Sequence, residues 1–275
     1  MVLSTIRPIT SLAAAVMDGI GRPSTLIPAD QAPEPFTLRN VDADSLRQAD
    51  VIFWIGASLE APLAKPFANL EIGARIIELG DTTGLLTYPT RDGREWESSA
   101  ADGGTPDGHL WLDSDNVKLL IGRIASSLTD VDFTHAEAYR TNAAELRKRV
   151  DALDEELAQE LTGLRDRPFL VLHDDLQYLE ARYNLVGVGS IVVDSAALTP
   201  ERLKQVAEKV AGLNAVCIVG YSADDDATLK EIAEAAGIRS VRIDLYGATM
   251  GDGPDAYFRA MRAMVSQLKS CLGGS

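Results

Sequence analysis

The feature that most constrains the fold is a long amphipathic stretch from Thr134 to about Leu164. Apolar residues recur in it at steps of three and four, which places them on one face of an α-helix. These residues are Tyr139, Ala143, Leu146, Val150, Leu153, Leu157 and Leu161. A helix of about 30 residues is roughly 45 Å long, more than an ordinary crossover between two strands requires. We therefore predict that it connects two separate halves of the chain.

Short apolar runs alternate with amphipathic stretches on both sides of this helix. The runs show little polar alternation, which is typical of parallel strands buried on both faces: Val2–Ile6, Val51–Ile55, Ile76–Leu79, Phe169–Leu172, Ile191–Asp194, Val216–Val219 and Val241–Asp244. Helical patterns lie between them, including Ser45–Ala49, Pro200–Gly212 and Asp225–Gly237. The sequence thus predicts an α/β fold with two lobes, each a mostly parallel sheet with flanking helices. The expected boundaries are 1–132 for the N-terminal lobe, 133–165 for the helix and 166–275 for the C-terminal lobe.

The charge of the chain excludes one class of partner. With 41 acidic residues against 26 lysines and arginines, the formal net charge is -15. Such a chain would repel DNA or RNA, so we expect no nucleic-acid partner. An acidic surface is compatible with attracting cations, although solubility alone is the favoured explanation of the charge.

The sequence shows neither a membrane span nor an export signal. No apolar run approaches the roughly 18 residues that a transmembrane helix needs. The first 15 residues lack the features of a signal peptide, with one early charge, Arg7, and an apolar stretch broken at Pro8. If the protein is exported, we expect this chain to correspond to the mature form.

Only three histidines are present, so each can be weighed separately. His173 ends a predicted buried strand, and Asp244 ends another; ligands of open α/β sheets gather at the carboxyl ends of strands. His109 lies where a polar loop meets an apolar run. His135 opens the long helix, and we interpret it as structural. Imidazole and carboxylate together suit zinc or another divalent transition metal.

A hydrolase interpretation of the chain is not supported. The segment Gly220–Asp224 partly matches a nucleophile elbow, with Ser222 after a strand, but the second glycine is missing. The serine, acid, histidine order of such enzymes also requires a histidine downstream, and none follows His173. A metal-dependent hydrolase would need an open metal position beside a general base, and no distinctive motif supplies that base.

The two cysteines, Cys217 and Cys271, do not form a CxxC pair. Two cysteines are also too few for a thiolate zinc site. From the residues alone, both a single disulfide and two separate buried thiols remain open.

Several blocks of sequence, in order along nearly the whole chain, resemble one known family. They are Ser4–Pro8, Met17–Pro23, Phe36–Arg39, Ala49–Gly56, Leu59–Glu60, Asp107–Asp113, Tyr139–Ala143, His173–Tyr178 and Asp255–Tyr257. The chain resembles the zinc-type (cluster A-I) metal solute-binding proteins of bacterial ABC transporters, a family that includes manganese binders. The resemblance implies two α/β lobes joined by a long backbone helix, with a metal site in the cleft between the lobes. It further implies a monomeric periplasmic protein, not an enzyme, that delivers its metal to an ABC transporter membrane permease.

The resemblance also implies a ligand set. His109 falls on the family's second ligand, His173 on the third and Asp244 on the late acid. Where the family usually has its first histidine, this chain has Glu34, so the implied set is Glu34, His109, His173 and Asp244. Glutamate is a competent oxygen ligand for Zn²⁺ and for Mn²⁺. We expect Zn²⁺ as the cargo, with Mn²⁺ as the alternative.

Two further expectations depend on the resemblance. Some zinc-type members carry a disulfide at positions that match Cys217 and Cys271, so we expect this bond here. The glutamate at position 34 keeps a third possibility open, namely a family member with weakened metal binding that acts through a protein partner. The polar segment Thr90–Gly108 contains no histidine where many members have a histidine-rich loop.

Overall fold

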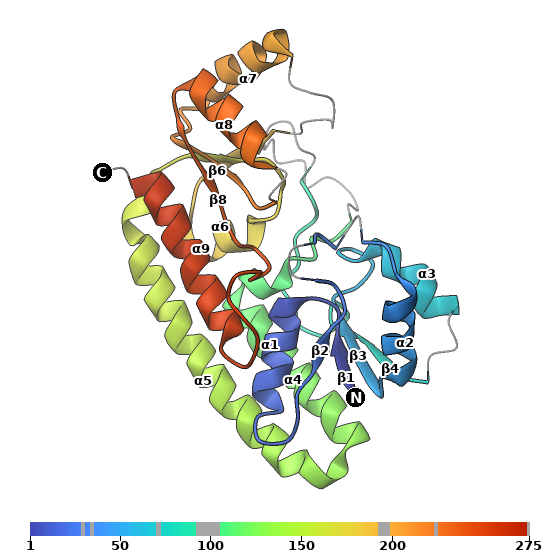
Figure 1. Ribbon diagram of the computed structural model, residues 1–275. Helices are drawn as coiled ribbons and strands as arrows, with labels where there is room; N and C mark the ends of the chain where they lie inside the picture. Colours follow the sequence, from blue (N-terminus) through green and yellow to red (C-terminus); the bar gives the residue numbers. More distant parts are fainter. Residues whose placement is uncertain are drawn as a thin grey trace. The chain divides into compact units, whose positions relative to one another are not determined.

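The structure is a computed structural model that describes all residues except 29–30, 34–35, 70–72, 92–104, 192–198, 223–224 and 274–275, and the side chains of residues 40, 41, 200 and 202. The chain divides into two compact units. Unit 1 comprises Met1–Thr87, Asp107–Glu155 and Tyr246–Met261. Unit 2 comprises Tyr88–Pro106, Glu156–Leu245 and Arg262–Ser275. Each unit is built around its own sheet (Figure 1).

The sheet of unit 1 is parallel throughout and has the strand order β2-β1-β3-β4. Its strands are β1 (Val2–Ser4), β2 (Ser24–Thr25), β3 (Val51–Trp54) and β4 (Arg75–Glu78). The helices of this unit are α1 (Arg7–Val16), α2 (Asn40–Gln48), α3 (Ala61–Asn69) and α4 (Ser114–Val131). Strand β3 is buried along its whole length, as its continuous apolar sequence predicts.

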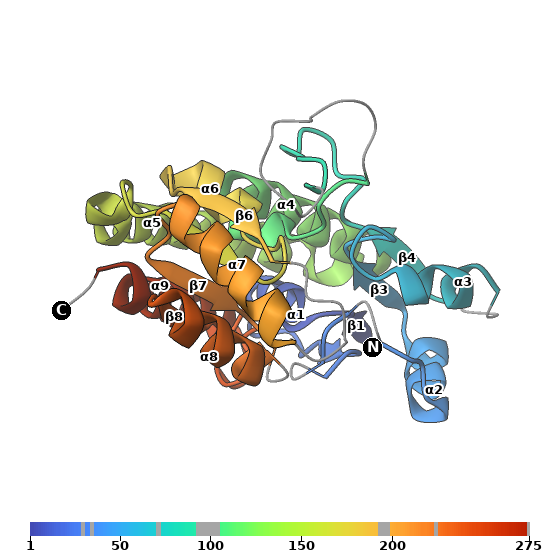
Figure 2. The ribbon, with the colours of Figure 1, turned by 90° about the horizontal axis from the view of Figure 1, so that it is seen from above.

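The sheet of unit 2 is also parallel, with the order β6-β5-β7-β8. Its strands are β5 (Phe169–Val171), β6 (Gly187–Ser190), β7 (Cys217–Gly220) and β8 (Arg239–Arg242). The helices of this unit are α6 (Gln177–Tyr183), α7 (Pro200–Gly212) and α8 (Asp225–Ala236). Helices α7 and α8 lie side by side in both views (Figures 1 and 2).

Helix α5 (Ala136–Leu161) is the long helix, and its residues belong to both units. Turns of 3-10 helix, Phe133–His135 and Thr162–Leu164, flank it. All seven apolar residues of the predicted face, from Tyr139 to Leu161, are buried. The last helix, α9 (Ala256–Gly273), is joined to α5 by ion pairs. Glu156 pairs with Arg262 and Glu160 with Lys269, both within unit 2.

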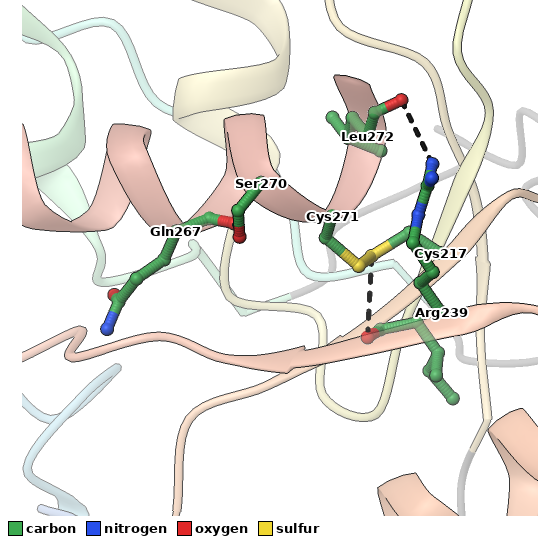
Figure 3. Close-up of a disulfide and its surroundings, with 7 residues drawn as sticks. Cys217, Arg239, Gln267, Ser270, Cys271 and Leu272 are labelled. Carbon is green, nitrogen blue, oxygen red and sulfur yellow. Dashed lines mark hydrogen bonds between the residues drawn. A yellow bond between two sulfur atoms is a disulfide. The ribbon is translucent and has the colours of Figure 1, made fainter. Parts of the chain in front are cut away.

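A disulfide between Cys217 and Cys271 fastens α9 to β7 in unit 2 (Figure 3). The two Cα atoms are 5.8 Å apart, within the usual range for this bond. Next to it, the Arg239 guanidinium donates to the carbonyl of Leu272 at 3.2 Å, which links the neighbouring strand β8 to the end of α9 as well. The disulfide expected from the family resemblance is therefore present.

The predicted fold class is confirmed: two parallel-sheet α/β lobes are linked by one long helix. The strands differ from the prediction in three places. Strand β2 was not expected. Strand β8 (Arg239–Arg242) starts two residues before the predicted buried run Val241–Asp244 and is mostly exposed, and β6 (Gly187–Ser190) precedes the apolar run predicted at Ile191–Asp194. Residues 192–194 of that run lie outside the described residues. The division at 132 and 165 stays a prediction. No helix in the described part of the chain is both long and apolar enough to cross a membrane.

Candidate metal-binding site

His109 stands in unit 1 immediately before a 3-10 turn, Leu110–Leu112, and its side chain is held by a neighbouring acid. One carboxylate oxygen of Asp107, Oδ1, accepts the backbone N–H of His109 at 2.9 Å and lies 2.7 Å from Nδ1 of the ring. Asp107 is only 2% exposed and His109 8%. The carboxylate therefore keeps the proton of the neutral imidazole on Nδ1 and leaves the lone pair on Nε2, the nitrogen that can bind a metal ion.

Close packing behind the loop helps to fix this histidine. A Cβ atom at Gly108 would lie 2.6 Å from Cβ of Leu59, so only glycine allows the two segments to approach this closely. Beyond the turn, Asp113 caps α4 by accepting the N–H of Asn116 at 2.8 Å. The sequence Asp107–Asp113 thus encodes a rigid loop that ends in a helix cap.

Two aromatic rings pack near the His109 imidazole. The ring of Trp111 is centred 5.2 Å from it and the ring of Tyr246 6.5 Å. The hydroxyl of Tyr246 lies 3.4 Å from Nε2. Trp111 is itself held in place, because Tyr257 donates its hydroxyl hydrogen to the Trp111 carbonyl at 3.0 Å. Neither Asp107 nor Tyr246 was predicted as part of the site, although Asp107 lies in the sequence block that carries the family resemblance.

A second buried acid in unit 1, Glu60, has a structural role. One of its oxygens accepts the backbone N–H groups of Ile55 and Gly56, each at 3.0 Å, and the other accepts the hydroxyl of Thr5. Burial, which outweighs these hydrogen bonds, raises the pKa of Glu60 to about 7. Glu60 joins the carboxyl ends of β1 and β3, and both of its oxygens accept hydrogen bonds from the protein.

His173 lies in unit 2, just beyond β5, and its side chain is half exposed. Its Nε2 is 3.4 Å from Oδ1 of Asp225, and its ring is 5.3 Å from that of Tyr221. Oδ2 of Asp225 accepts the backbone N–H groups of Tyr221 and Ser222 at the start of α8. Burial raises the pKa of Asp225, but the hydrogen bonds from His173 and from these N–H groups outweigh it and hold the pKa below its usual range.

Asp225 was not predicted from the sequence as part of the site. Its local signal is an acid in the first turn of a helix that follows a strand, which normally indicates a helix cap. The proximity to His173 comes from the sheet, because β5 and β7 are neighbours and both end at the same edge. No local pattern in the sequence predicts that pairing.

The acid that follows His173 is held by an arginine. Arg91 donates to both oxygens of Asp174 and also to both oxygens of Glu180, which is buried in α6. Tyr88, three residues before Arg91, has its ring centre 5.1 Å from that of Tyr178. The segment that begins at Tyr88 is in this way attached to the loop that carries His173.

The other two predicted ligands are Asp244 and Glu34. Asp244 follows β8 in unit 2, is half-buried, and donates its backbone N–H to Oε1 of Gln267 at 3.2 Å. Glu34 lies outside the described residues. Within the described ranges, no three His, Cys, Asp or Glu side chains are gathered closely enough to hold a metal ion. The set Glu34, His109, His173 and Asp244 accordingly stays a prediction.

His135, which we interpreted as structural, is an exposed residue at the turn before α5. Its Nδ1 lies 2.7 Å from Oδ2 of Asp132, and the hydroxyl of Tyr139 donates to the same oxygen at 2.9 Å. The imidazole thus takes part in the hydrogen bonding of the turn that starts α5.

Two parallel α/β units linked by one long helix, with histidines on the loops of each, define a two-lobed solute-binding protein. The sequence matches the ZnuA family, described as the periplasmic component A of a zinc-uptake complex, over residues 2–271. The chain belongs to this family, which consists of transport proteins that act in the periplasm.

Curated relatives and solved structures agree with this assignment. The chain is 32% identical to the high-affinity zinc uptake system protein ZnuA of Brucella abortus, over 98% of this chain and 91% of the relative. It is 28% identical to the ZnuA of Paracoccus denitrificans, over 99% and 91%. A crystal structure of ZnuA has the same fold, with a TM-score of 0.82 at 21% identity and 98% coverage of both chains. A Mn-bound periplasmic metal-binding protein from Candidatus Liberibacter asiaticus does so with a TM-score of 0.78 at 21% identity, with 98% of each chain covered.

Proposed function

We propose that this protein captures a divalent metal ion, Zn²⁺ in the first place, and delivers it to the membrane permease of an ABC importer. The observation that carries the proposal is the orientation of the His109 ring and the position of its lone pair. A buried carboxylate holds its Nδ1 at 2.7 Å and directs the Nε2 lone pair away from that carboxylate, which is how metal-binding imidazoles are oriented in proteins. Relatives named as zinc uptake proteins support Zn²⁺ as the cargo.

The proposed ligands are Glu34, His109, His173 and Asp244. Two neutral imidazoles and two carboxylates together neutralise a divalent ion and satisfy the four-coordinate preference of zinc. Asp225 acts behind His173, since its Oδ1 lies 3.4 Å from Nε2 and orients the ring before the metal arrives. The protein performs no chemistry on its cargo; it binds, carries and releases the ion as a monomer.

Titration of the metal-free protein with zinc and with manganese tests the proposal. His109→Ala and His173→Ala each remove one neutral imidazole from a small ligand set, so zinc affinity should fall by orders of magnitude. His135→Ala is the matched control, because His135 lies in the turn before α5, and affinity should stay unchanged. If His135→Ala weakens binding as much as the other two changes, the proposed site is wrong.

Position 34 has its own test. Glu34→His introduces the donor that most family members have, and zinc affinity should be retained or increased; Glu34→Ala should reduce it. Equal affinities for the wild type and Glu34→Ala would show that the fourth donor is another group. A wild-type protein that binds neither zinc nor manganese would favour the alternative of a family member that acts through a protein partner.

The alternative cargo is Mn²⁺, and one observation favours keeping it. The fold is shared with Mn-bound periplasmic proteins as well as with zinc-bound ones. Two carboxylates among four ligands are also more compatible with manganese than a site of imidazoles alone. A higher affinity for manganese than for zinc in the same titrations would decide for this alternative.

A further inference from the structure

Tyr246 stands against the nitrogen of His109 that the proposed function requires. It is 7% exposed, lies in unit 1 with His109, and packs its ring against Trp111 with 5.5 Å between ring centres. Its hydroxyl is 3.4 Å from Nε2 of His109. The tyrosine also follows Asp244, another proposed ligand, by two residues in the sequence.

The direction of the contact between these two residues follows from Asp107. Because Oδ1 of Asp107 accepts at Nδ1, the proton of the neutral imidazole is on Nδ1 and Nε2 is an acceptor. The Tyr246 hydroxyl is therefore the donor, and it points its hydrogen at the lone pair that would bind the metal. A separation of 3.4 Å is longer than the usual O–H···N distance, so this hydrogen bond is weak and easily exchanged.

We propose that Tyr246 caps Nε2 of His109 in the metal-free protein and must release it when the ion binds. Tyr246 then lowers the affinity for the metal ion, because its hydroxyl and the ion compete for the same lone pair on Nε2. The hydrogen bond forms again when the ion leaves. This inference rests on the proposed function, because it concerns the same imidazole. A carrier that must hand over its ion benefits from such a competitor, since the metal-free state is stabilised relative to the loaded one.

A tyrosine in this position would have the opposite effect on zinc affinity if its hydroxyl were a metal ligand, and the experiment distinguishes the two cases. Two donors on one tetrahedral zinc ion, each about 2.0–2.2 Å from it, lie roughly 3.3–3.6 Å apart, and Tyr246 Oη and His109 Nε2 are separated by 3.4 Å. If Tyr246 were a ligand, removing its oxygen would weaken zinc binding; if it is a cap, removing the oxygen strengthens it.

Tyr246→Phe removes only the hydroxyl and keeps the ring against Trp111. We expect zinc to bind about two- to tenfold more tightly to this variant in competition titrations, the change that corresponds to losing one neutral hydrogen bond from the metal-free state. Tyr257→Phe is the matched control: it removes a hydroxyl from the same cluster, one that donates to the Trp111 carbonyl rather than to the imidazole. Its zinc affinity should stay within about twofold of the wild type.

A second measurement uses the metal-free protein alone. With only three histidines in the chain, two-bond ¹⁵N–¹H spectra resolve each ring, and His109→Ala assigns the signals of His109. Tyr246→Phe should move the Nε2 resonance of His109 downfield, because a donor to its lone pair is lost, and should leave the protonated Nδ1 in place. Tyr257→Phe should leave both signals unchanged.

The possible outcomes separate the inference from the proposed function. If the wild type binds zinc and Tyr246→Phe binds it equally well or more weakly, the proposal that Tyr246 caps Nε2 is overturned. A His109 Nε2 signal that does not respond to Tyr246→Phe overturns it too, whether or not zinc binds. Absence of zinc binding by the wild type, together with the expected shift of Nε2, overturns the proposed function and leaves the hydrogen bond established.

Discussion

Two buried acids of unit 1 show how the same residue type acquires different roles. Asp107 is two residues from His109 and orients its ring, so its role follows from a short sequence block. Glu60 accepts hydrogen bonds from the ends of two strands, and its partner Thr5 is 55 residues away in the sequence. The role of Glu60 therefore follows from the pairing of β1 with β3.

The raised pKa of Glu60 makes a prediction for stability. A buried carboxyl with a folded pKa of about 7, against an ordinary value of 4.5, is protonated in the folded state over a range where the unfolded chain has lost the proton. The folded state then binds more protons, so the stability that Glu60 contributes is present at about pH 4.5 and is lost as the pH rises toward 7. Between these two pH values, the contribution of Glu60 to the free energy of unfolding changes by about 3 kcal/mol.

Glu60→Gln tests this prediction. Glutamine imitates the protonated acid: its oxygen can accept the N–H groups of Ile55 and Gly56, and its amide can donate to Thr5. In urea unfolding, the wild type should lose stability between about pH 5 and 7 relative to Glu60→Gln, and the two should run parallel above pH 8. Parallel pH profiles over the whole range would show that the carboxyl is already ionised in the folded protein at acidic pH.

At the level of single residues, the sequence could predict candidates but not their pairing. His109, His173 and Asp244 were identified because they stand at strand or loop ends, which is a local property. The contacts of His173 with Asp225 and of Nε2 of His109 with Tyr246 join positions 52 and 137 residues apart. Such contacts are set by strand order and helix packing, which periodicity and composition do not encode.

At the level of elements, length and burial decide which predictions succeed. Helices α5, α7 and α8 lie within the ranges predicted from periodicity, because each buries one continuous apolar face. Strand β2 has only two residues, and β6 has the sequence Gly-Val-Gly-Ser, in which a single β-branched residue stands between two glycines. Both are strands only because they pair with β1 and β5, so their own sequence gives little signal.

The attachment of the Tyr88–Arg91 segment to α6 is also an element-level feature, and it can be tested. Arg91 is 22% exposed in its side chain and Glu180 only 7%, so Arg91→Gln removes a positive charge that is paired with a nearly buried carboxylate. Removing one partner of a buried ion pair costs about 3 kcal/mol. We expect the free energy of unfolding of unit 2 to fall by that amount, measured by urea unfolding or by hydrogen exchange of the α6 amides.

Arg262→Gln is the matched control in the same unit. Arg262 pairs with Glu156 through two hydrogen bonds of 2.7 Å, but its side chain is 48% exposed, and exposed pairs contribute about 0–1 kcal/mol. Similar losses for the two variants would mean that the Arg91 contacts do not persist in solution.

At the level of the whole molecule, the sequence predicted two α/β lobes for one physical reason. Alternating strands and helices on each side of a helix of about 30 residues require two sheets, because a single layer leaves most of that helix uncovered. Helix α5 does contribute residues to both units. The proposed ligands are drawn from both units, because His109 belongs to unit 1 and His173 and Asp244 belong to unit 2.

Zinc should therefore stabilise both units at once. A ligand that binds only the folded state adds about 2.7 kcal/mol at a concentration of 100 times Kd and about 4.1 kcal/mol at 1,000 times Kd. Since the proposed ligands come from both units, unfolding either one releases the ion. Hydrogen exchange should slow in the sheets of both units when zinc is added, and chelator should reverse the effect. His109→Ala, although it changes unit 1 alone, should abolish the protection of β5 and β7 in unit 2; protection that persists there would place the zinc ligands entirely within unit 2.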